Sequence, residues 1–265
     1  MGFRARVEMR SEKGPVRQNN EDCMGVLEAP NARRGIDAVY IVADGLGGHE
    51  RGEEASAMAV DLLLREYGAH GPMGDTEPEG SLESSLARTL RDISEAVYEA
   101  GLSGESMHRD PQRAGMATTA TVALLSGGRA HLGHVGDSRA YLLRDRRLTQ
   151  VTEDHTLLAQ QTGAGVRIPE EARVYMSNAL TQAVGLEQPI APFTHSFAVE
   201  AGDRLLLCSD GLHGFMDDAS IASIILSEEQ DGVVDALISR AIAEGSSDNI
   251  TIVLVSFDRV DSPSG

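Results

Sequence analysis

The clearest hydrophobic pattern in the chain is the apolar run AVYIVA at residues 38–43, which ends at an aspartate and a group of glycines. A run of this length bounded by turn residues is typical of a strand that is buried on both faces. Similar aliphatic and β-branched runs predict five more strands, at 117–125, 130–135, 140–143, 205–208 and 250–257.

Apolar residues at helical spacing predict a second set of elements. The expected helices are 53–67, 82–100, 154–161, 169–175, 219–226 and 233–243. Consecutive strands favour antiparallel hairpins, and the long helices are expected to pack outside a sheet. We therefore expect an α+β fold, a four-layer αββα sandwich of two antiparallel sheets flanked by helices.

The domain organisation follows from the absence of any linker in the sequence. Residues 71–80, GPMGDTEPEG, are expected to form a loop between two helices. The short element around 171–176, with its flanking glycines, is expected to be mobile and outside the core. We expect one domain over residues 1–258 and a flexible tail over 259–265.

The composition narrows the choice of partners and compartment. The chain has 265 residues and a net charge of −18, with 41 acidic against 23 basic residues. Phosphate binding needs a basic surface, so this balance argues against nucleic acid and anionic membranes as partners. Cys23 and Cys208 form no C-x-x-C pair, which favours a reducing compartment. With neither a signal peptide nor about 18 consecutive apolar residues, we expect a cytoplasmic protein, and a monomer.

The turn after the first strand is unusual for a glycine turn. Strand, glycines and helix are the layout of a dinucleotide-binding loop, but Glu50 stands where the last glycine of G-x-G-x-x-G belongs. Asp44, at the end of the strand, would also repel a phosphate unless a positive charge lay between them. The turn therefore needs a different explanation.

Acidic residues recur at strand ends and turns beside small residues. They are Glu21, Asp22, Asp44, Asp137, Asp210 and Asp248. A single aspartate in a turn is usually a cap or a turn former. Several strand ends that converge on one edge would crowd these negative charges, and such crowding requires compensating cations.

The ligand types select the cation. His49 and Glu50 lack the second histidine of the zinc motif H-E-x-x-H. His131 and His134 point to opposite faces of a strand, so we interpret these two histidines as structural. Oxygen ligands alone favour Mg²⁺ or Mn²⁺. Two such ions about 3.5–4 Å apart suit phosphoryl chemistry, with a bridging water of lowered pKa as the nucleophile. Asp44 would bridge the two ions, and Arg17 would offer a bidentate fork to phosphoryl oxygens.

The ordered set of motifs strongly resembles the metal-dependent Ser/Thr protein phosphatases of type 2C, in their compact bacterial form. The motifs are VRQNNED, VADGLGGHERGEEAS, GMATTATVALL, GHVGDSRAYLLRDRRLTQVTEDH, ALTQAVG, GDRLLLCSDGLHGFM and EGSSDNITIVLV. They extend over residues 16–255. The resemblance implies hydrolysis of phosphoserine and phosphothreonine in proteins by a metal-bridging hydroxide that attacks phosphorus in line. It also implies phosphorylated proteins as partners, among them a Ser/Thr kinase and its substrates.

The resemblance also assigns the site residues. It places Asp44, Asp210 and Asp248 on a first Mn²⁺ or Mg²⁺ ion. A second ion would be held by Glu21, Asp44 and the Gly45 carbonyl, with Asp22 acting through water. Asp137 and Asp210 match the ligands of a third, weaker ion, and Arg17 matches the phosphate-binding arginine. Residues 158–185 correspond to the flap, a variable segment beside the site that influences substrate choice.

Two positions depart from the common pattern of the family. Leu46 stands where many eukaryotic members have a histidine proposed as general acid, so we expect water on a metal, rather than His49, to protonate the leaving group. A normal pH–rate profile for His49→Ala supports this expectation, and loss of its acidic limb contradicts it. Gln182 replaces a frequent arginine, which affects the expected flap contacts but not catalysis.

Three other functions fit parts of the sequence. Ser138 in GDSRA nearly matches G-x-S-x-G, but Ala140 replaces the second glycine, and a serine hydrolase would tolerate EDTA. The only lysine, Lys13, is not in the G-K-[ST] context that a P-loop requires. A catalytically weak, phosphoprotein-binding pseudophosphatase predicts loss of a metal carboxylate, whereas all of them are present.

Overall fold

The computed structural model describes residues 3–46, 51–69, 81–102, 115–186, 189–227 and 231–259. The strands are β1 (Phe3–Glu12), β2 (Asp22–Glu28), β3 (Ala38–Asp44), β4 (Ala120–Ser126), β5 (Arg129–Val135), β6 (Arg139–Arg144), β7 (Arg147–Gln150), β8 (Phe193–Ala198), β9 (Arg204–Cys208) and β10 (Ile250–Arg259). The helices are α1 (Gly52–Tyr67), α2 (Leu82–Leu102), α3 (Leu157–Gly163), α4 (Glu170–Ser177), α5 (Asp210–His213), α6 (Asp218–Ser227) and α7 (Val233–Ala243).

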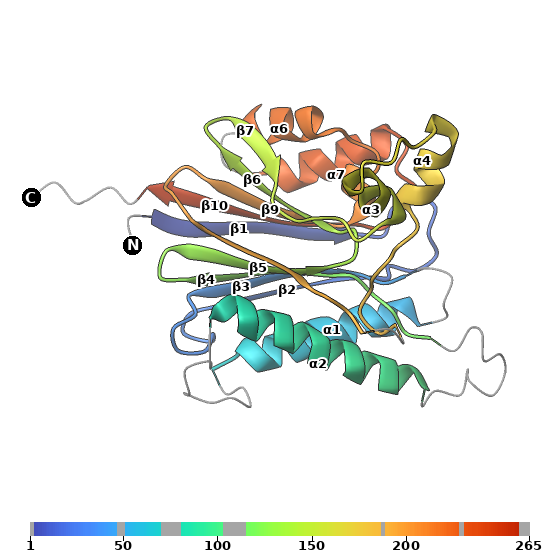
Figure 1. Ribbon diagram of the computed structural model, residues 1–265. Coiled ribbons are helices and arrows are strands. Elements are labelled where there is room, and N and C mark those ends of the chain that lie inside the picture. Colours follow the sequence, from blue (N-terminus) through green and yellow to red (C-terminus); the bar gives the residue numbers. More distant parts are fainter. Residues whose placement is uncertain are drawn as a thin grey trace, which may run out of the picture.

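Within the described ranges, ten strands form two antiparallel sheets that lie face to face. One has the order β1-β10-β9-β6-β7 and the other the order β2-β3-β4-β5-β8. Helices α6 and α7 cover the outer face of the first sheet, and α1 and α2 cover the outer face of the second (Figure 1). The expected four-layer αββα sandwich is therefore confirmed.

The burial pattern of the central strands follows from this layering. In β3, Tyr40 and Val42 face the other sheet, whereas Val39 and Ile41 pack toward the helices. Side chains alternate between the faces of a strand, so a strand covered on both faces is apolar throughout. Each such aliphatic side chain contributes about 1.5–3 kcal/mol when fully buried. The sandwich is therefore a stiff frame for the residues at the ends of its strands.

The predicted strands are all present with small shifts at their ends, but four observed strands were not predicted. The missed strands are β1, β2, β7 and β8. In β1 the residues alternate strictly, with Phe3, Ala5 and Val7 packing on the inter-sheet core and arginine or glutamate between them. This period-2 pattern is a strand signal that single-face burial produces.

The helices also agree, with one difference at the start of α3. The sequence predicts a helix from Asp154, but α3 begins at Leu157 because Thr156 caps it: Thr156 Oγ1 accepts a hydrogen bond from the Ala159 amide at 3.2 Å. Helix α5 was missed because four residues show no helical period. The predicted loop at 71–80 and all but the first residue of the predicted tail at 259–265 lie outside the described residues. None of the described helices is long and apolar enough to cross a membrane.

Candidate metal centre

Aspartates at strand ends in both sheets lie close enough for their charges to act on one another. β10, which follows one of them, begins at the end of the sandwich away from the chain termini (Figure 1). Asp22 and Asp44 are direct partners across the antiparallel pair β2–β3. Asp210 follows β9 in the opposite sheet and opens α5, and Asp248 precedes β10. The two sheets are joined here by a hydrogen bond of 2.8 Å from Ser209 Oγ to Asp22 Oδ2.

These carboxylates raise one another's pKa values. Withdrawal from water is the largest cause, and it raises the pKa of Asp22 and of Asp210 to about 6. Asp44 is shifted well above its usual pKa by burial and then by the charges of Asp22, Asp210, Asp137 and Asp248, in that order. Such mutual repulsion is relieved either by protons or by bound cations.

The donor set fits a cation that prefers oxygen ligands. Asp22 Oδ1 is buried and accepts no hydrogen bond from any described residue, so one buried acceptor of this group is left for a ligand. A site whose side-chain ligands are all carboxylates suits Mg²⁺ or Mn²⁺ rather than zinc. Among the described residues, no three His, Cys, Asp or Glu side chains are placed closely enough to coordinate one ion together. Binding of an ion therefore requires these side chains to rearrange.

The glycine turn after Asp44 is a close approach of backbone segments. The Gly45 amide donates to the Glu21 carbonyl at 3.0 Å, and Ser56 Oγ donates to the same carbonyl at 2.6 Å. A Cβ atom on Gly45 would overlap the carbonyl oxygens of Gly52 and Glu21. Only glycine fits there, which explains why glycine follows Asp44 without any bound dinucleotide phosphate.

Two threonines that were not singled out from the sequence hold Asp44 in place. The Asp44 amide donates to Thr119 Oγ1 at 2.9 Å, and the Asp44 carbonyl accepts from the Thr119 amide and from Thr118 Oγ1. Thr119 Oγ1 also lies 2.7 Å from Ser138 Oγ. Ser138 is fully buried in this contact. It is therefore a structural neighbour of the site and not an exposed nucleophile.

Asn249 connects the start of β10 to the segment 13–21 beside the acids and was likewise missed. Its Oδ1 accepts from the Glu21 amide at 2.9 Å, and its Nδ2 donates to the carbonyls of Lys13 and Asn19 at 2.8 and 3.0 Å. Its own amide donates to Asp248 Oδ1 at 2.8 Å. The residue is buried. Its position directly after Asp248 was the only signal in the sequence.

Asn249→Ala is expected to lower the free energy of unfolding by about 3 kcal/mol, because it leaves a buried amide and two carbonyls without partners. Chemical denaturation at equilibrium measures this loss. Asn31→Ala, a replacement of an exposed asparagine, is the control and should change stability by less than about 0.5 kcal/mol. A loss of similar size in both variants would contradict the role assigned to Asn249.

Arg17 lies beside the acids, as the sequence predicts. Its Nη2 donates to Asp248 Oδ2 at 2.7 Å, while 42% of the side chain is exposed. The hydrogen bond to Asp248 is the main cause that raises the pKa of Arg17. The guanidinium is thus held at the centre by one contact and keeps further N–H groups for a ligand.

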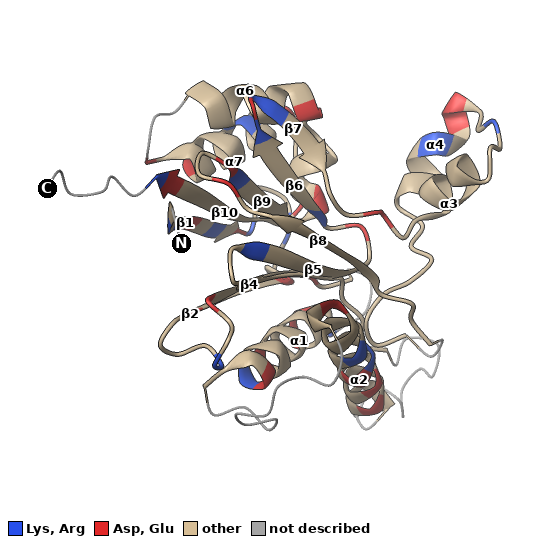
Figure 2. Cartoon of the chain, turned by 60° about the vertical axis from the view of Figure 1, so that its left-hand side comes forward, with Lys and Arg blue, Asp and Glu red and all other residues tan. Residues whose placement is uncertain are grey.

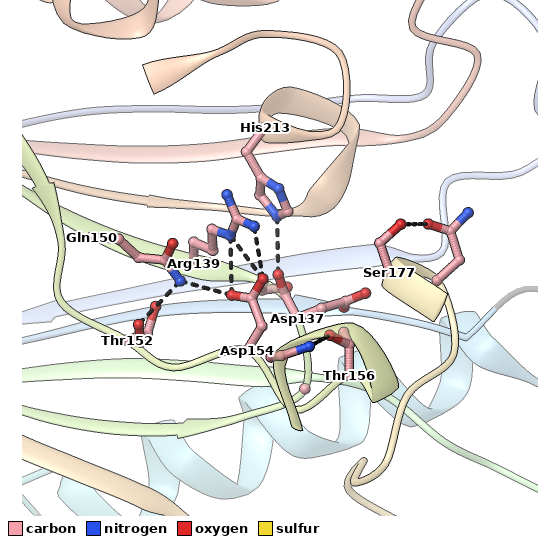
Figure 3. A network of polar contacts seen from close by, with 12 residues as sticks. Asp137, Arg139, Gln150, Thr152, Asp154, Thr156, Ser177 and His213 are labelled. Carbon is pink, nitrogen blue, oxygen red and sulfur yellow. Dashed lines mark hydrogen bonds and ion pairs between the residues drawn. The ribbon is translucent and has the colours of Figure 1, made fainter. Parts of the chain in front are cut away.

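Asp137 occupies the turn between β5 and β6, where the preceding residue, Gly136, is hydrogen-bonded to His155. Burial, followed by the charge of Asp210, raises its pKa to about 7. Its backbone carbonyl lies 2.9 Å from His213 Nε2 (Figure 3). Burial lowers the pKa of His213 to about 3, so its ring is neutral and Nε2 carries the hydrogen that the carbonyl accepts. Helix α5 therefore links Asp210 to the Asp137 turn.

The structure also places His131 and His134 and the two positions that depart from the family pattern, Leu46 and Gln182. His131 lies near Glu83 of α2, whereas His134 lies 2.9 Å from Thr121 Oγ1, so the two face opposite sides of β5 as expected. Gln182 Oε1 accepts from the Ala191 amide at 2.6 Å. The Leu46 amide bonds the Ala117 carbonyl. His49 lies outside the described residues.

Comparison with known proteins places the chain in a family. A family model described as protein phosphatase 2C matches residues 18–231. The serine/threonine protein phosphatase PstP of Mycobacterium tuberculosis is 35% identical over 249 residues, which cover 94% of this chain and 44% of PstP. This chain thus spans less than half the length of that curated relative. The serine/threonine phosphatase stp of Listeria monocytogenes is 33% identical over 254 residues, which cover 95% of this chain and 96% of stp.

Solved structures agree. The catalytic domain of PstP, in complex with two manganese ions, superposes with a TM-score of 0.74 at 35% identity, over 96% of this chain and 98% of that domain. The chain belongs to the protein phosphatase 2C family, a family of metal-dependent serine/threonine protein phosphatases.

Proposed function

We propose that this protein hydrolyses phosphoserine and phosphothreonine in proteins, in a reaction that depends on Mn²⁺ or Mg²⁺. The observation that carries the proposal is the convergence of Asp22, Asp44 and Asp210 from two sheets beside the guanidinium of Arg17. Negative charge that is crowded in this way suits cations, and Arg17 adds a fixed positive group for a phosphoryl oxygen.

The ligand assignment extends this proposal to individual residues. Asp44, Asp210 and Asp248 would hold one ion; Glu21, Asp44 and the Gly45 carbonyl would hold the second, with Asp22 acting through water. Asp137 and Asp210 would serve a third, weaker site. Divalent ions, when bound, neutralise developing phosphoryl charge and supply a water nucleophile at neutral pH.

Arg17 is proposed to orient the phosphoryl group. Its fork can bind two phosphoryl oxygens in one plane, which fixes the direction of the phosphorus–oxygen bond that breaks. The contact with Asp248 at 2.7 Å limits the rotamers of the long side chain before a substrate arrives. Less side-chain entropy is then lost on binding.

Arg17→Ala is expected to raise KM for a phosphothreonine peptide about 10- to 100-fold with a smaller fall in kcat, because the fork binds the substrate in the ground state. Steady-state kinetics with Mn²⁺ checks this split. Arg10→Ala is a matched control, since Arg10 has a similar exposure of 48% and a similar contact of 2.7 Å with Asp235 away from the centre. An unchanged KM in Arg17→Ala would remove Arg17 from the site.

The domain boundaries and the partners are part of the proposal. Residues 1–258 would form one catalytic domain with a flap at 158–185, and 259–265 would be a tail. The partners would be phosphorylated proteins, including a Ser/Thr kinase and its substrates, met by a monomer in the cytoplasm. The acidic surface, with a net charge of −18, disfavours nucleic acid and membrane lipids as substrates.

Phosphate release from phosphoserine and phosphothreonine peptides tests the function, with Mn²⁺, with Mg²⁺ and with EDTA. We expect turnover with either ion and none with EDTA. Turnover in EDTA would contradict the metal requirement. Absence of turnover in a folded protein that binds Mn²⁺ would favour a phosphoprotein-binding pseudophosphatase instead.

A further inference from the structure

The flap is attached to the sandwich mainly through its stem. Helices α3 and α4 stand away from the two sheets (Figure 2), and every residue of both helices is at least partly exposed. The stem of the flap consists of residues 155–157, which lead into it, and residues 179–181, which lead out of it. Thr156 and Leu180 form a β-bridge between these two segments. The Leu157 amide donates to the Ala179 carbonyl at 2.9 Å, and the Thr181 amide donates to the His155 carbonyl at 2.8 Å.

The stem is fastened to the turn that carries Asp137. The His155 amide donates to the Gly136 carbonyl at 2.7 Å, and the Gly136 amide donates to His155 Nδ1 at 3.2 Å. Burial lowers the pKa of His155, which keeps its ring neutral and Nδ1 able to accept. The flap stem and Asp137 are therefore separated by a single residue, Gly136.

An ion pair between Arg139 and Asp154 also connects the Asp137 turn to the flap stem. Arg139 Nε lies 3.0 and 3.1 Å from the two Asp154 oxygens, and Arg139 Nη2 lies 2.7 Å from Asp154 Oδ2 (Figure 3). Gln150 Nε2 donates to Asp154 Oδ1 at 2.7 Å, and Arg139 Nη1 donates to the Tyr141 hydroxyl at 2.9 Å. The side chains of Arg139 and Asp154 are mostly buried, with exposed fractions of 24% and 14%.

We propose that Arg139 and Asp154 are positioning residues that set the flap relative to Asp137 and thereby favour phosphoprotein substrates over small phosphate esters. Arg139 lies two residues after Asp137, and Asp154 lies two residues before the helix cap Thr156. The pair thus joins the first residue of β6 to the start of the flap. This inference rests on the proposed phosphatase function.

The flap offers contacts that only a protein substrate can use. Val174 and Tyr175 on α4 are 73% and 75% exposed, which is unusual for large apolar side chains. A polypeptide around a phosphorylated residue can cover such side chains, whereas an isolated phosphate ester is confined to the centre. Without the ion pair, the flap would adopt many orientations. This would weaken the contacts of a polypeptide substrate with the flap but not the binding of a small phosphate ester.

Another ion pair on the same strand provides a matched control. Arg144, at the far end of β6, binds Asp203 through two hydrogen bonds of 2.8 and 2.6 Å. Asp203 is buried, but its pair lies away from the flap and from Asp137. Asp203→Asn and Asp154→Asn therefore remove the same charge from similar pairs, and only the second acts on the stem.

The test compares both variants with the wild type, with Mn²⁺, on phosphorylated casein and on p-nitrophenyl phosphate. We expect Asp154→Asn to lower kcat/KM for casein about tenfold, mainly through KM, and kcat/KM for p-nitrophenyl phosphate by no more than about twofold. Asp203→Asn should leave the ratio of the two values unchanged. Equal losses on both substrates, or an equal change of the ratio in Asp203→Asn, would overturn the positioning role.

Hydrogen–deuterium exchange on metal-free protein separates this inference from the function. The amides of Leu157 and Thr181 should exchange faster in Asp154→Asn than in Asp203→Asn, while those of β10 keep their protection. Unchanged exchange at the stem would overturn the brace even in an active enzyme. A wild type that is inactive on both substrates would instead refute the proposed function, with the stem still tested by exchange.

Discussion

Asp210→Asn is expected to lower metal-dependent phosphate release by about 10³-fold or more, because Asp210 is assigned to two of the ion sites, the first and the third. Asp210 lies at the centre of the mutual repulsion, and its charge raises the pKa of Asp22, Asp44 and Asp137. The asparagine has the same shape, so the loss reports charge and ligation rather than packing. Initial rates at saturating Mn²⁺ measure the effect.

Asp218→Asn is the matched control for this experiment. Asp218 opens α6 as Asp210 opens α5, and its side chain is exposed. The substitution removes the same charge from a neighbouring first helical turn, and activity should stay within about twofold of the wild type. Retention of activity in Asp210→Asn would show that the ions, or the chemistry, lie elsewhere.

Asp137→Asn is expected to stabilise the metal-free protein by on the order of 4 kcal/mol at about pH 8, and by progressively less as the pH falls from about 7 toward 3.8. Burial and Asp210 raise the folded-state pKa of Asp137 to about 7, against an ordinary value of 3.8. The folded state therefore binds the proton more tightly than the unfolded state. The stabilising effect of the proton is fully present only below the unfolded value of 3.8 and is lost progressively as the pH rises to about 7. The uncharged asparagine avoids this loss.

The comparison of variant and wild type is needed because histidines act in the opposite sense. Burial lowers the pKa of His134 and of His213 to about 3, so their contribution to stability is lost as the pH falls below about 6.5. Both histidines are present in both proteins, and their effect cancels in the difference. Urea denaturation at several pH values, with EDTA, gives the difference directly. A constant or reversed difference would contradict the charge crowding at Asp137.

The fold was largely predictable because its layers leave a periodic record in the sequence. Central strands such as β3 are covered on both faces and are therefore apolar throughout. The four missed strands are the edge strands of the two sheets. Of these, β1 alternates apolar and polar residues, whereas β8 carries Thr194, His195 and Ser196 among its few apolar residues. Such edge strands gain stability from pairing rather than from apolar burial, so composition alone does not reveal them.

The acids of the centre were predictable for a different reason. Asp44 and Asp210 each end an apolar strand beside glycine, which is a local pattern. The residues that orient them are not marked in this way. Asn249 and Thr119 act through hydrogen bonds to segments far away in the chain, such as Glu21 and Ser138. The brace between Arg139 and Asp154 likewise joins positions 15 residues apart, whose contact only the folded chain shows.

The metal centre is tested most directly by measuring bound Mn²⁺ per chain and released phosphate on the same samples. Metal-free wild type and Asp44→Asn are titrated with Mn²⁺ in parallel. We expect phosphate release from a phosphothreonine peptide to rise only as the wild type fills two sites. Asp44→Asn should bind fewer ions and stay inactive. Full activity of the wild type without bound Mn²⁺, or equal binding and activity in Asp44→Asn, would contradict a metal centre built on these carboxylates.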